Sequence, residues 1–239
     1  MADTPALIPP FTGFPRQGIS FFHALALAQS REWFHAHKAD YETLWRAPMQ
    51  SLLEELRTPL AKIYGRKLDP PKIFRINRDV RYTNDKSPYK THCAGKIAFA
   101  GAVNNQEGMV ALYLHLGMEE EAGCGTYELD PDRLAHFRRA VIAPKSGEAL
   151  ARALGAVEKH GMRQISIGEL KRAPSGIPVD HPRIAILRHK GLAVSFGKIP
   201  KAARNTVQLK EWLLAQAKIA APVMAWSHAQ KIGFPSAEE

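Results

Sequence analysis

Basic side chains are concentrated in one short part of the chain, residues 72–96. Its 25 residues include seven Lys or Arg and two Asp, a net charge of +5. The whole chain of 239 residues carries a net charge of +10, so half of the excess lies here. Guanidinium groups bind phosphate and carboxylate groups through paired hydrogen bonds, and ammonium groups bind them as point charges. The segment therefore predicts binding of a phosphorylated or other anionic ligand, nucleic acid included.

Three stretches in and after this segment alternate between polar and apolar residues, which is typical of β-strands with one buried face. They are Ile73–Tyr82, Cys93–Gly101 and Met109–Gly117. The loops between them are short and polar, which favours antiparallel neighbours. If the three strands pair, one sheet face carries the polar side chains of Arg75, Asn77, Asp79, Arg81, His92, Lys96, Tyr113 and His115. Such a face combines cations for an anion with a carboxylate and titratable imidazoles.

Loops beside this face supply further candidates. Lys86 and Tyr89 lie in the loop after the first strand, where Asn84 is a typical turn residue, and Lys171-Arg172 form a basic loop that could close over an anion. The predicted ligand-binding residues are Arg75, Arg78, Asp79, Arg81, Asp85, Lys86, Tyr89, Lys90, Tyr113, His115, Lys171 and Arg172. An alternative interpretation makes these charges structural, as an ion-pair ladder on a solvated sheet face.

These residues are compatible with three classes of function. The first, which we favour, is a module that binds a phosphorylated or other anionic ligand. The second is an enzyme acting on a phosphate ester or related anionic substrate, with His115 or Asp79 as general acid or base. The third is a protein-partner binding module. A pocket lined by the strand and loop residues favours the enzyme, an open basic groove favours nucleic acid, and an exposed apolar patch favours a protein partner.

The elements that position these residues follow the order helices, strands, helices, which predicts an α+β fold. We expect an antiparallel sheet of three or more strands packed with N-terminal and C-terminal helices. Residues 1–239 are expected to form a single domain, with an irregular N-terminal arm at 1–19, a helical region at 20–66, a sheet region at 72–117 and a mixed, mainly helical region at 130–233. Further strands are predicted at Ile165–Leu170 and Leu192–Phe196.

Individual residues mark the expected ends of helices. Ser20 and Ser30 are predicted N-caps, and Asp130-Pro131 combines an N-cap with proline at the first helical position. Pro222 is expected to end a C-terminal helix because proline lacks an N–H donor. Between the sheet and Asp130, Glu119–Glu121 are expected to form a solvated turn.

Three separated blocks carry a family resemblance. They are Arg75–Tyr82 with Asp85–Thr91, then upstream Arg31–Phe34 with Lys38 and Tyr41, and downstream Leu170–Pro174 with Gly176, Pro178 and His181. In this order they resemble an uncharacterised family, domain of unknown function 2461, over residues 11–199. Cys124, in a Gly-rich spot, departs from the family's pattern. The resemblance implies the extent of the fold and the region to watch, and it implies no particular activity.

Composition narrows the class of protein. Hydrophobic residues make up 45% and charged residues 23% of the chain, as in globular proteins rather than disordered ones. No apolar run approaches the roughly 20 residues of a membrane helix and no secretory signal is evident, so we expect a cytoplasmic protein without membrane contact. Cys93 and Cys124 form no paired motif, so we expect two buried thiols, no metal and no cofactor.

Overall fold

The structure is a computed structural model that describes residues 8–81, 85–103 and 108–235. Its helices are α1 (Gly18–Ala28), α2 (Arg31–Ala36), α3 (Lys38–Tyr41), the π-helix η1 (Glu42–Arg46), α4 (Ala47–Tyr64), α5 (Pro131–Ile142), α6 (Pro144–Glu158), α7 (Ile184–Arg188), α8 (Lys201–Arg204) and α9 (Gln208–Ala229). Its strands are β1 (Lys72–Ile73), β2 (His92–Ala98), β3 (Val110–Gly117), β4 (Glu121–Thr126), β5 (Arg163–Ile165) and β6 (Leu192–Ser195). The α+β class is confirmed. Within the described ranges, no helix is long and apolar enough to cross a membrane.

The strands form one antiparallel sheet in the order β1-β2-β3-β4-β6-β5. In the β2–β3 pair, Lys96 lies opposite Tyr113 and Ala94 lies opposite His115. In the β3–β4 pair, Glu121 lies opposite His115. Residues directly opposite each other in a sheet project to the same side. These pairs therefore decide which side chains meet on each face.

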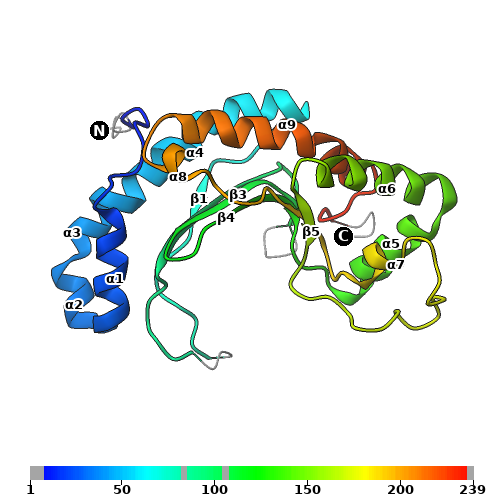
Figure 1. Cartoon of the computed structure of the whole chain (residues 1–239), viewed down its shortest axis with the longest axis horizontal. Coiled ribbons are helices and arrows are strands. Elements are labelled where there is room, and N and C mark those ends of the chain that lie inside the picture. The colour runs from blue at the N-terminus through cyan, green and yellow to red at the C-terminus, as the bar shows by residue number, and fades with distance from the viewer. Residues whose placement is uncertain (1–7, 82–84, 104–107, 236–239) are drawn as a thin grey trace, which may run out of the picture.

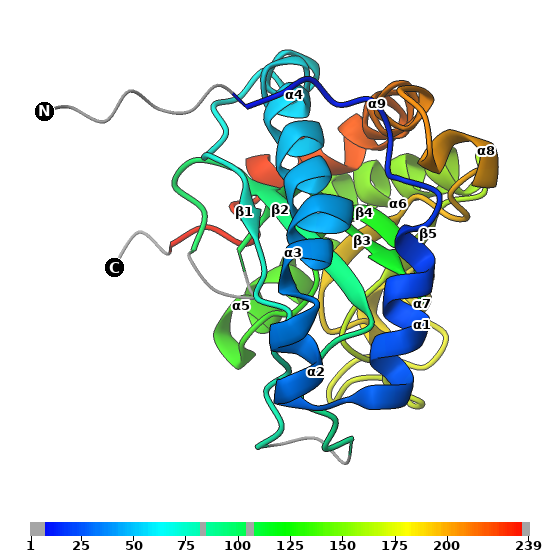
Figure 2. The ribbon, with the colours of Figure 1, turned by 90° about the vertical axis from the view of Figure 1, so that its left-hand side faces the viewer.

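Helices α4 and α9 cover one face of the sheet, as Figure 2 shows. α4 packs on β2, and α9 packs on β3 and β4. The buried side of α4 has the spacing of an amphipathic helix, at Met49, Leu52, Leu53, Leu56 and Leu60. Gly95 of β2 allows the close approach, because a Cβ there would lie 2.5 Å from Leu53 Cδ1. Leu114 lies opposite Gly95 and is fully buried, so this face is the apolar core face.

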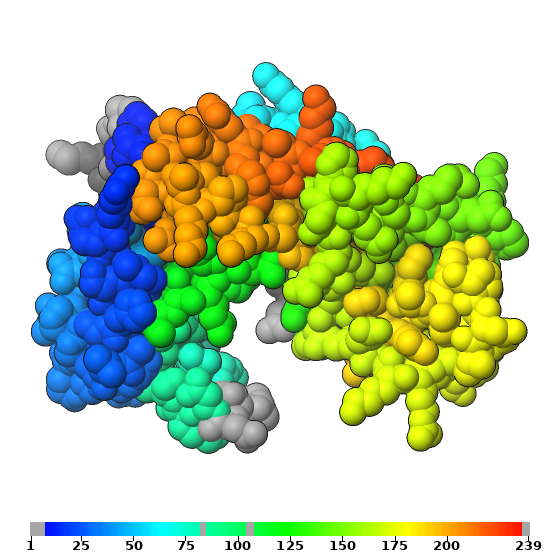
Figure 3. Space-filling model, viewed as in Figure 1, coloured from blue at the N-terminus to red at the C-terminus, as the bar shows by residue number. Residues whose placement is uncertain are grey.

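The opposite face of the sheet is concave and forms the underside of an arch (Figure 1). Helices α1 to α3 stand at one end of the arch, and α5, α7 and residues 166–183 stand at the other. The space-filling view shows a hollow between these two ends, with residues of β3 and β4 at its roof (Figure 3). Polar side chains on the concave face are therefore in a position to meet a ligand.

The prediction of a strand at Ile73–Tyr82 is wrong beyond Ile73, because β1 ends at that residue. Residues 74–81 and 85–91 instead belong to a long loop that projects away from the sheet (Figure 1). The predicted strand end at Tyr82 and the turn residue Asn84 lie outside the described residues. The polar residues of this stretch are consequently carried on a loop and not on the face of the sheet.

Backbone hydrogen bonds join the two arms of this loop. The Arg78 N–H donates to the Pro88 carbonyl at 2.8 Å, and the Lys90 N–H donates to the Ile76 carbonyl at 2.9 Å. Pro88 has no N–H with which to return a bond, so the ladder is interrupted there. The alternation of polar and apolar residues therefore accompanies an extended loop, not a regular strand.

The far half of the sheet differs from the prediction in two places. β4 begins at Glu121, within the segment where a solvated turn was expected. β5 ends at Ile165, so residues 166–170 are not the predicted strand. β6 matches its prediction from Leu192 to Ser195.

Most predicted helix starts are confirmed. Ser30 and Asp130 each accept a backbone N–H from three residues ahead, at 3.1 and 2.8 Å, so both are N-caps. Ser20 is not one, because α1 already begins at Gly18, whose N–H donates to the carbonyl of Pro15.

Candidate functional site

A cavity of about 840 Å³ lies on the concave face of the sheet. Volumes of this size are typical of sites for small molecules. Charged and polar groups of three kinds line it: the lysine side (Lys72, Lys90 and Lys96), an imidazole pair (His92 and His115) with Tyr113, and the glutamate turn (Glu119, Glu120 and Glu121). The cavity therefore carries basic, imidazole and acidic groups among apolar lining residues such as Phe74 and Val110.

The lysine side holds like charges at close quarters. Lys72 of β1 lies directly opposite Lys96 of β2, and like charges in this position destabilise a sheet. Burial lowers the pKa of Lys96, and the charge of Lys72 lowers it further, against a smaller effect of Asp69. Burial likewise lowers the pKa of Lys90, whose Nζ donates to the Arg75 carbonyl at 3.2 Å. The ammonium groups of Lys90 and Lys96 are thus less well solvated than those of ordinary surface lysines.

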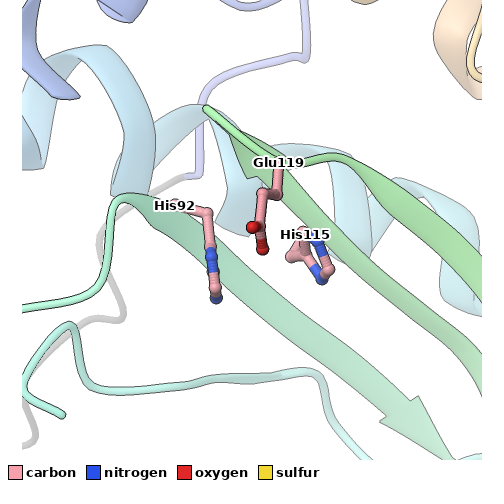
Figure 4. Close-up of side chains that lie close together, drawn as sticks. All are labelled: His92, His115 and Glu119. Carbon is pink, nitrogen blue, oxygen red and sulfur yellow. The ribbon is translucent and has the colours of Figure 1, made fainter. Parts of the chain in front are cut away.

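The imidazoles of His92 and His115 stack on each other, with ring centroids 4.5 Å apart. Figure 4 shows both side chains on the same side of the two strands, with Glu119 beside them. Burial lowers the pKa of His92 to about 4, with contributions from the charges of His115 and Lys90. Burial also lowers the pKa of His115, and the nearby glutamates partly oppose this. Both rings are consequently mainly neutral at pH 7, and each offers one N–H donor and one acceptor nitrogen.

Tyr113 orients one ring of this pair. Its hydroxyl lies 3.1 Å from Nδ1 of His115, and burial raises the pKa of the phenol to about 12. The phenol therefore stays protonated and the contact is a hydrogen bond between neutral groups. It leaves Nε2 of His115 for a ligand.

Two members of the glutamate turn have partners outside the cavity. Glu120 Oε1 accepts from the Arg204 guanidinium at 2.6 Å, and Glu121 Oε1 accepts from the Ser195 hydroxyl at 2.6 Å. The Glu119 carboxylate instead joins the imidazole pair. One ligand atom from each of Glu119, His92 and His115 lies within 4.8 Å of the other two. This group has the composition of a metal-ligand set.

The roof of the cavity beside Tyr113 is backbone, because β4 contributes glycines there. Gly123 lies opposite Tyr113, and a Cβ on it would lie 2.5 Å from the Val194 carbonyl oxygen. Gly125 has a φ of 111°, in the left-handed region that favours glycine, and a Cβ there would lie 2.4 Å from the Leu192 carbonyl oxygen. The glycines thus permit the close pairing of β4 with β6 and place no side chain in the cavity.

Several predicted ligand-binding residues lie on the projecting loop. The Arg81 guanidinium donates to the Asp79 carboxylate at 3.0 and 2.7 Å, and Arg78 pairs with Asp85 at 3.1 Å. Lys86 Nζ donates to a backbone carbonyl of the same loop at 2.8 Å. The hydrogen bonds from Arg81 hold the pKa of Asp79 far below its ordinary value, which makes Asp79 a weak base. Both acidic groups of the loop are therefore paired with arginines of the same loop.

Tyr89, Lys171 and Arg172 lie away from the cavity. Tyr89 is buried, and its ring stacks on Phe34 with centroids 4.5 Å apart. Its backbone N–H and carbonyl both bond the Gln29 side chain, so Tyr89 anchors the base of the loop to the helices. Lys171 and Arg172 are exposed in the segment between β5 and α7.

The structure brings together part of the predicted set. The predicted ligand-binding residues that line the cavity are Lys90, Tyr113 and His115. His92 and Lys96, which the alternation placed on the same face, line it as well. Sequence reasoning missed Lys72 and Glu119. Lys72 directly precedes the predicted strand, and only its pairing with Lys96 in the structure places it at the cavity. The position of Glu119 depends on how the turn between β3 and β4 closes.

Comparison with known proteins supports the resemblance noted in the sequence. The family described as conserved hypothetical protein (DUF2461) matches residues 17–226, which include the whole sheet and the lining of the cavity. No curated protein and no solved structure matches the chain. The chain belongs to the conserved hypothetical family DUF2461.

Proposed function

We propose that the cavity on the concave sheet face binds a small anionic molecule through the lysine side. The observation that carries this proposal is the direct pairing of Lys72 with Lys96 across β1 and β2. Burial makes the charged form of Lys96 less favourable, and the charge of Lys72 adds to this cost. A phosphate or carboxylate group between the two lysines would offset this cost and the repulsion across the strands through charge-assisted hydrogen bonds.

The size of the cavity favours a small ligand over a nucleic acid. A volume of about 840 Å³ accommodates a molecule of metabolite size. Binding to duplex DNA instead draws on many cationic contacts along an extended surface. The arginines of the projecting loop do not line the cavity, and Arg81 is bonded to Asp79. The focus of positive charge within reach of a bound anion is therefore the lysine side.

Calorimetric titration with pyrophosphate and with citrate tests the proposal. We expect wild-type protein to bind one of the two, and Lys72→Gln and Lys96→Gln each to weaken binding by about 1.5–3 kcal/mol, the range for a hydrogen bond to a charged group. Lys159→Gln is the matched control, because Lys159 is exposed at the end of α6. Equal affinity in wild-type protein and the Lys72 and Lys96 variants would refute the lysine side, and so would the absence of binding by wild-type protein.

A second candidate function, hydrolysis of a phosphate ester in the same cavity, is supported by the imidazole pair. His92 and His115 are neutral, half-buried and in the same cavity as the lysine side, so either can accept a proton from the water that attacks a bound phosphate ester. Release of phosphate from p-nitrophenyl phosphate measures this activity. His115→Ala should abolish it, whereas the exposed His160→Ala should not. Activity that survives in His115→Ala would exclude this assignment.

A further inference from the structure

We propose that His92, His115 and Glu119 bind a divalent transition-metal ion, with Zn²⁺ as the ion that suits this donor set best. One ligand atom of each residue lies within 4.8 Å of the other two. Atoms that share a zinc ion at about 2.1 Å lie at most about 4.2 Å apart. Glu119 is exposed at a turn, so rotation of its side chain can close the remaining gap.

The elements hold the two imidazoles in place for such an ion. His92 starts β2 and lies opposite Gly117, while His115 lies two residues before Gly117 on β3. Nδ1 of His115 lies 3.1 Å from the Tyr113 hydroxyl, which can accept the Nδ1–H, and a contact of this kind orients metal-binding histidines and leaves an unprotonated Nε2 for the ion. One nitrogen of each ring lies within 4.8 Å of the other, and a small rotation of the rings can bring both to one ion.

Gly117 brings the carboxylate within reach of these rings. A Cβ at this position would lie 2.3 Å from the Thr91 carbonyl oxygen and 2.6 Å from Cα of His92. Any other residue would therefore push the β3–β4 turn away from the start of β2. With glycine, the end of β3 stays close to the start of β2, and the Glu119 carboxylate lies beside the imidazole pair (Figure 4).

The composition of the set is that of a metal centre with an open position. Two histidines and one glutamate are the protein ligands of several zinc hydrolases, in which water or substrate takes the next position. Glu120 and Glu121 are bonded to Arg204 and Ser195, so Glu119 is the carboxylate of this turn that is placed for an ion. All three ligands line the cavity, so an open position would face the space proposed for the anion.

Cobalt titration of the full chain tests the metal site directly. Protein stripped with a chelator and dialysed into chelator-free buffer is titrated with Co²⁺ while its visible d–d absorption is recorded, and Zn²⁺ is then added in competition. We expect one Co²⁺ per chain, displaced by one Zn²⁺. The titration contains no anionic ligand, and Lys72→Gln should bind metal as wild-type does. Failure of this site is therefore distinguishable from failure of the anion proposal.

Variants of the three ligands locate the ion. His92→Ala, His115→Ala and Glu119→Ala should each weaken Co²⁺ binding by more than about 100-fold, and Tyr113→Phe by about 10- to 100-fold, the range for outer-contact residues. His160→Ala should bind as wild-type does. Thermal melts check folding, and the exposed Glu119 provides a variant that leaves the core intact. Folded wild-type protein without a cobalt spectrum would overturn the proposal, and so would wild-type affinity in Glu119→Ala.

Discussion

At the scale of single residues, Lys72 lowers the stability of the sheet through like-charge repulsion. The strand pairing at its position does not require a charged side chain. Lys72 lies directly opposite Lys96, on the short edge strand β1. A polar uncharged side chain would keep the pairing and remove the repulsion. Residues that reduce stability in this way are frequent where a protein binds a ligand, because function and stability compete there. A substitution of Lys72 therefore tests two quantities together, the affinity for the anion and the free energy of unfolding.

Lys72→Gln should raise stability and lower anion affinity at the same time. Without ligand we expect the free energy of unfolding to increase by a few tenths of a kcal/mol, because one of two opposed charges is gone. Urea unfolding at low salt measures this, with Lys159→Gln as the control for loss of a surface charge. A Lys72→Gln protein less stable than wild-type would mean that the lysine has a favourable partner and that the like-charge argument fails.

Cys93 and Cys124 should be unreactive in the folded protein. Both thiols are buried, as predicted, and burial raises the pKa of each to about 12, so little thiolate exists at pH 8. An aromatic disulfide reagent should label two thiols in urea and none at a comparable rate in buffer. Rapid labelling of either thiol in buffer would contradict the packing of β2 or β4.

The same thiols predict a loss of stability at high pH. In the unfolded chain they lose their protons near the ordinary pKa of 9.0, whereas in the folded protein they hold them to about 12. The unfolded state therefore binds fewer protons above pH 9, and the stability due to these groups, complete below pH 9, is lost between pH 9 and 12. The free energy of unfolding of Cys124→Ala should decline less steeply over this range than that of wild-type. Parallel profiles would show that Cys124 titrates normally.

The sequence predicts the site residues that lie on β2 and β3, and it misses those that lie beside these two strands. His92, Lys96, Tyr113 and His115 were placed on one face by alternation alone, because β2 and β3 are regular strands whose side chains alternate. Glu119 could not be placed in this way, because its position depends on a turn. Turns and strand register are set by contacts between distant segments, which periodicity does not report.

At the scale of elements, β4 is the strand that shapes the cavity and the one that the sequence hides. Its central residues are Gly123, Cys124 and Gly125, and glycine is depleted in strands. β4 is nonetheless a strand because it lies between β3 and β6 and is hydrogen-bonded on both sides. The backbone of its neighbours, not its own propensity, decides its conformation.

Gly125→Ala should therefore be costly. The φ of 111° and the Leu192 carbonyl oxygen, 2.4 Å from the position of a Cβ, together predict a loss of more than about 1 kcal/mol in the free energy of unfolding. Gly155→Ala is the matched control, because Gly155 lies inside α6 with no atom within 4 Å of an added Cβ. There we expect a gain of about 0.5–1 kcal/mol. Equal effects at the two sites in urea unfolding would contradict the geometry of β4.

Pro222 shows tertiary packing overriding a local signal. α9 continues through this proline to Ala229, although proline inside a helix costs about 3 kcal/mol. Ala220, Val223 and Met224 around it are buried, and burying apolar side chains of this kind contributes about 1.5–3 kcal/mol for each large one. The helix therefore gains more by continuing across the sheet than by ending where the sequence alone suggests.

At the scale of the whole molecule, the fold separates a structural face from a functional one. α4 and α9 cover the convex side of the arch, and the concave side carries the lysines, imidazoles and glutamates (Figure 1). The projecting loop is anchored by Tyr89 at its base, and two of its arginines pair with Asp85 and Asp79 of the same loop. Binding by the loop and binding by the cavity are therefore separable.

Arg81→Ala distinguishes the two surfaces. Because Arg81 is 72% exposed and bonded to Asp79 on the loop, we expect no change in pyrophosphate affinity. Thermal melts should also change little, since exposed ion pairs contribute little to stability. Titration of Arg81→Ala beside Lys96→Gln shows which surface binds. Weakened pyrophosphate binding in the Arg81 variant would transfer the site to the loop.

The most direct test of the anion site is the position of a heavy anion in the protein. Crystals of the full chain soaked in tungstate reveal bound anions by the anomalous scattering of tungsten. The anion site predicts an anomalous peak inside the cavity, within hydrogen-bond distance of the ammonium groups of Lys72 and Lys96. A peak on the projecting loop beside Arg75 or Arg81, with none in the cavity, would contradict it.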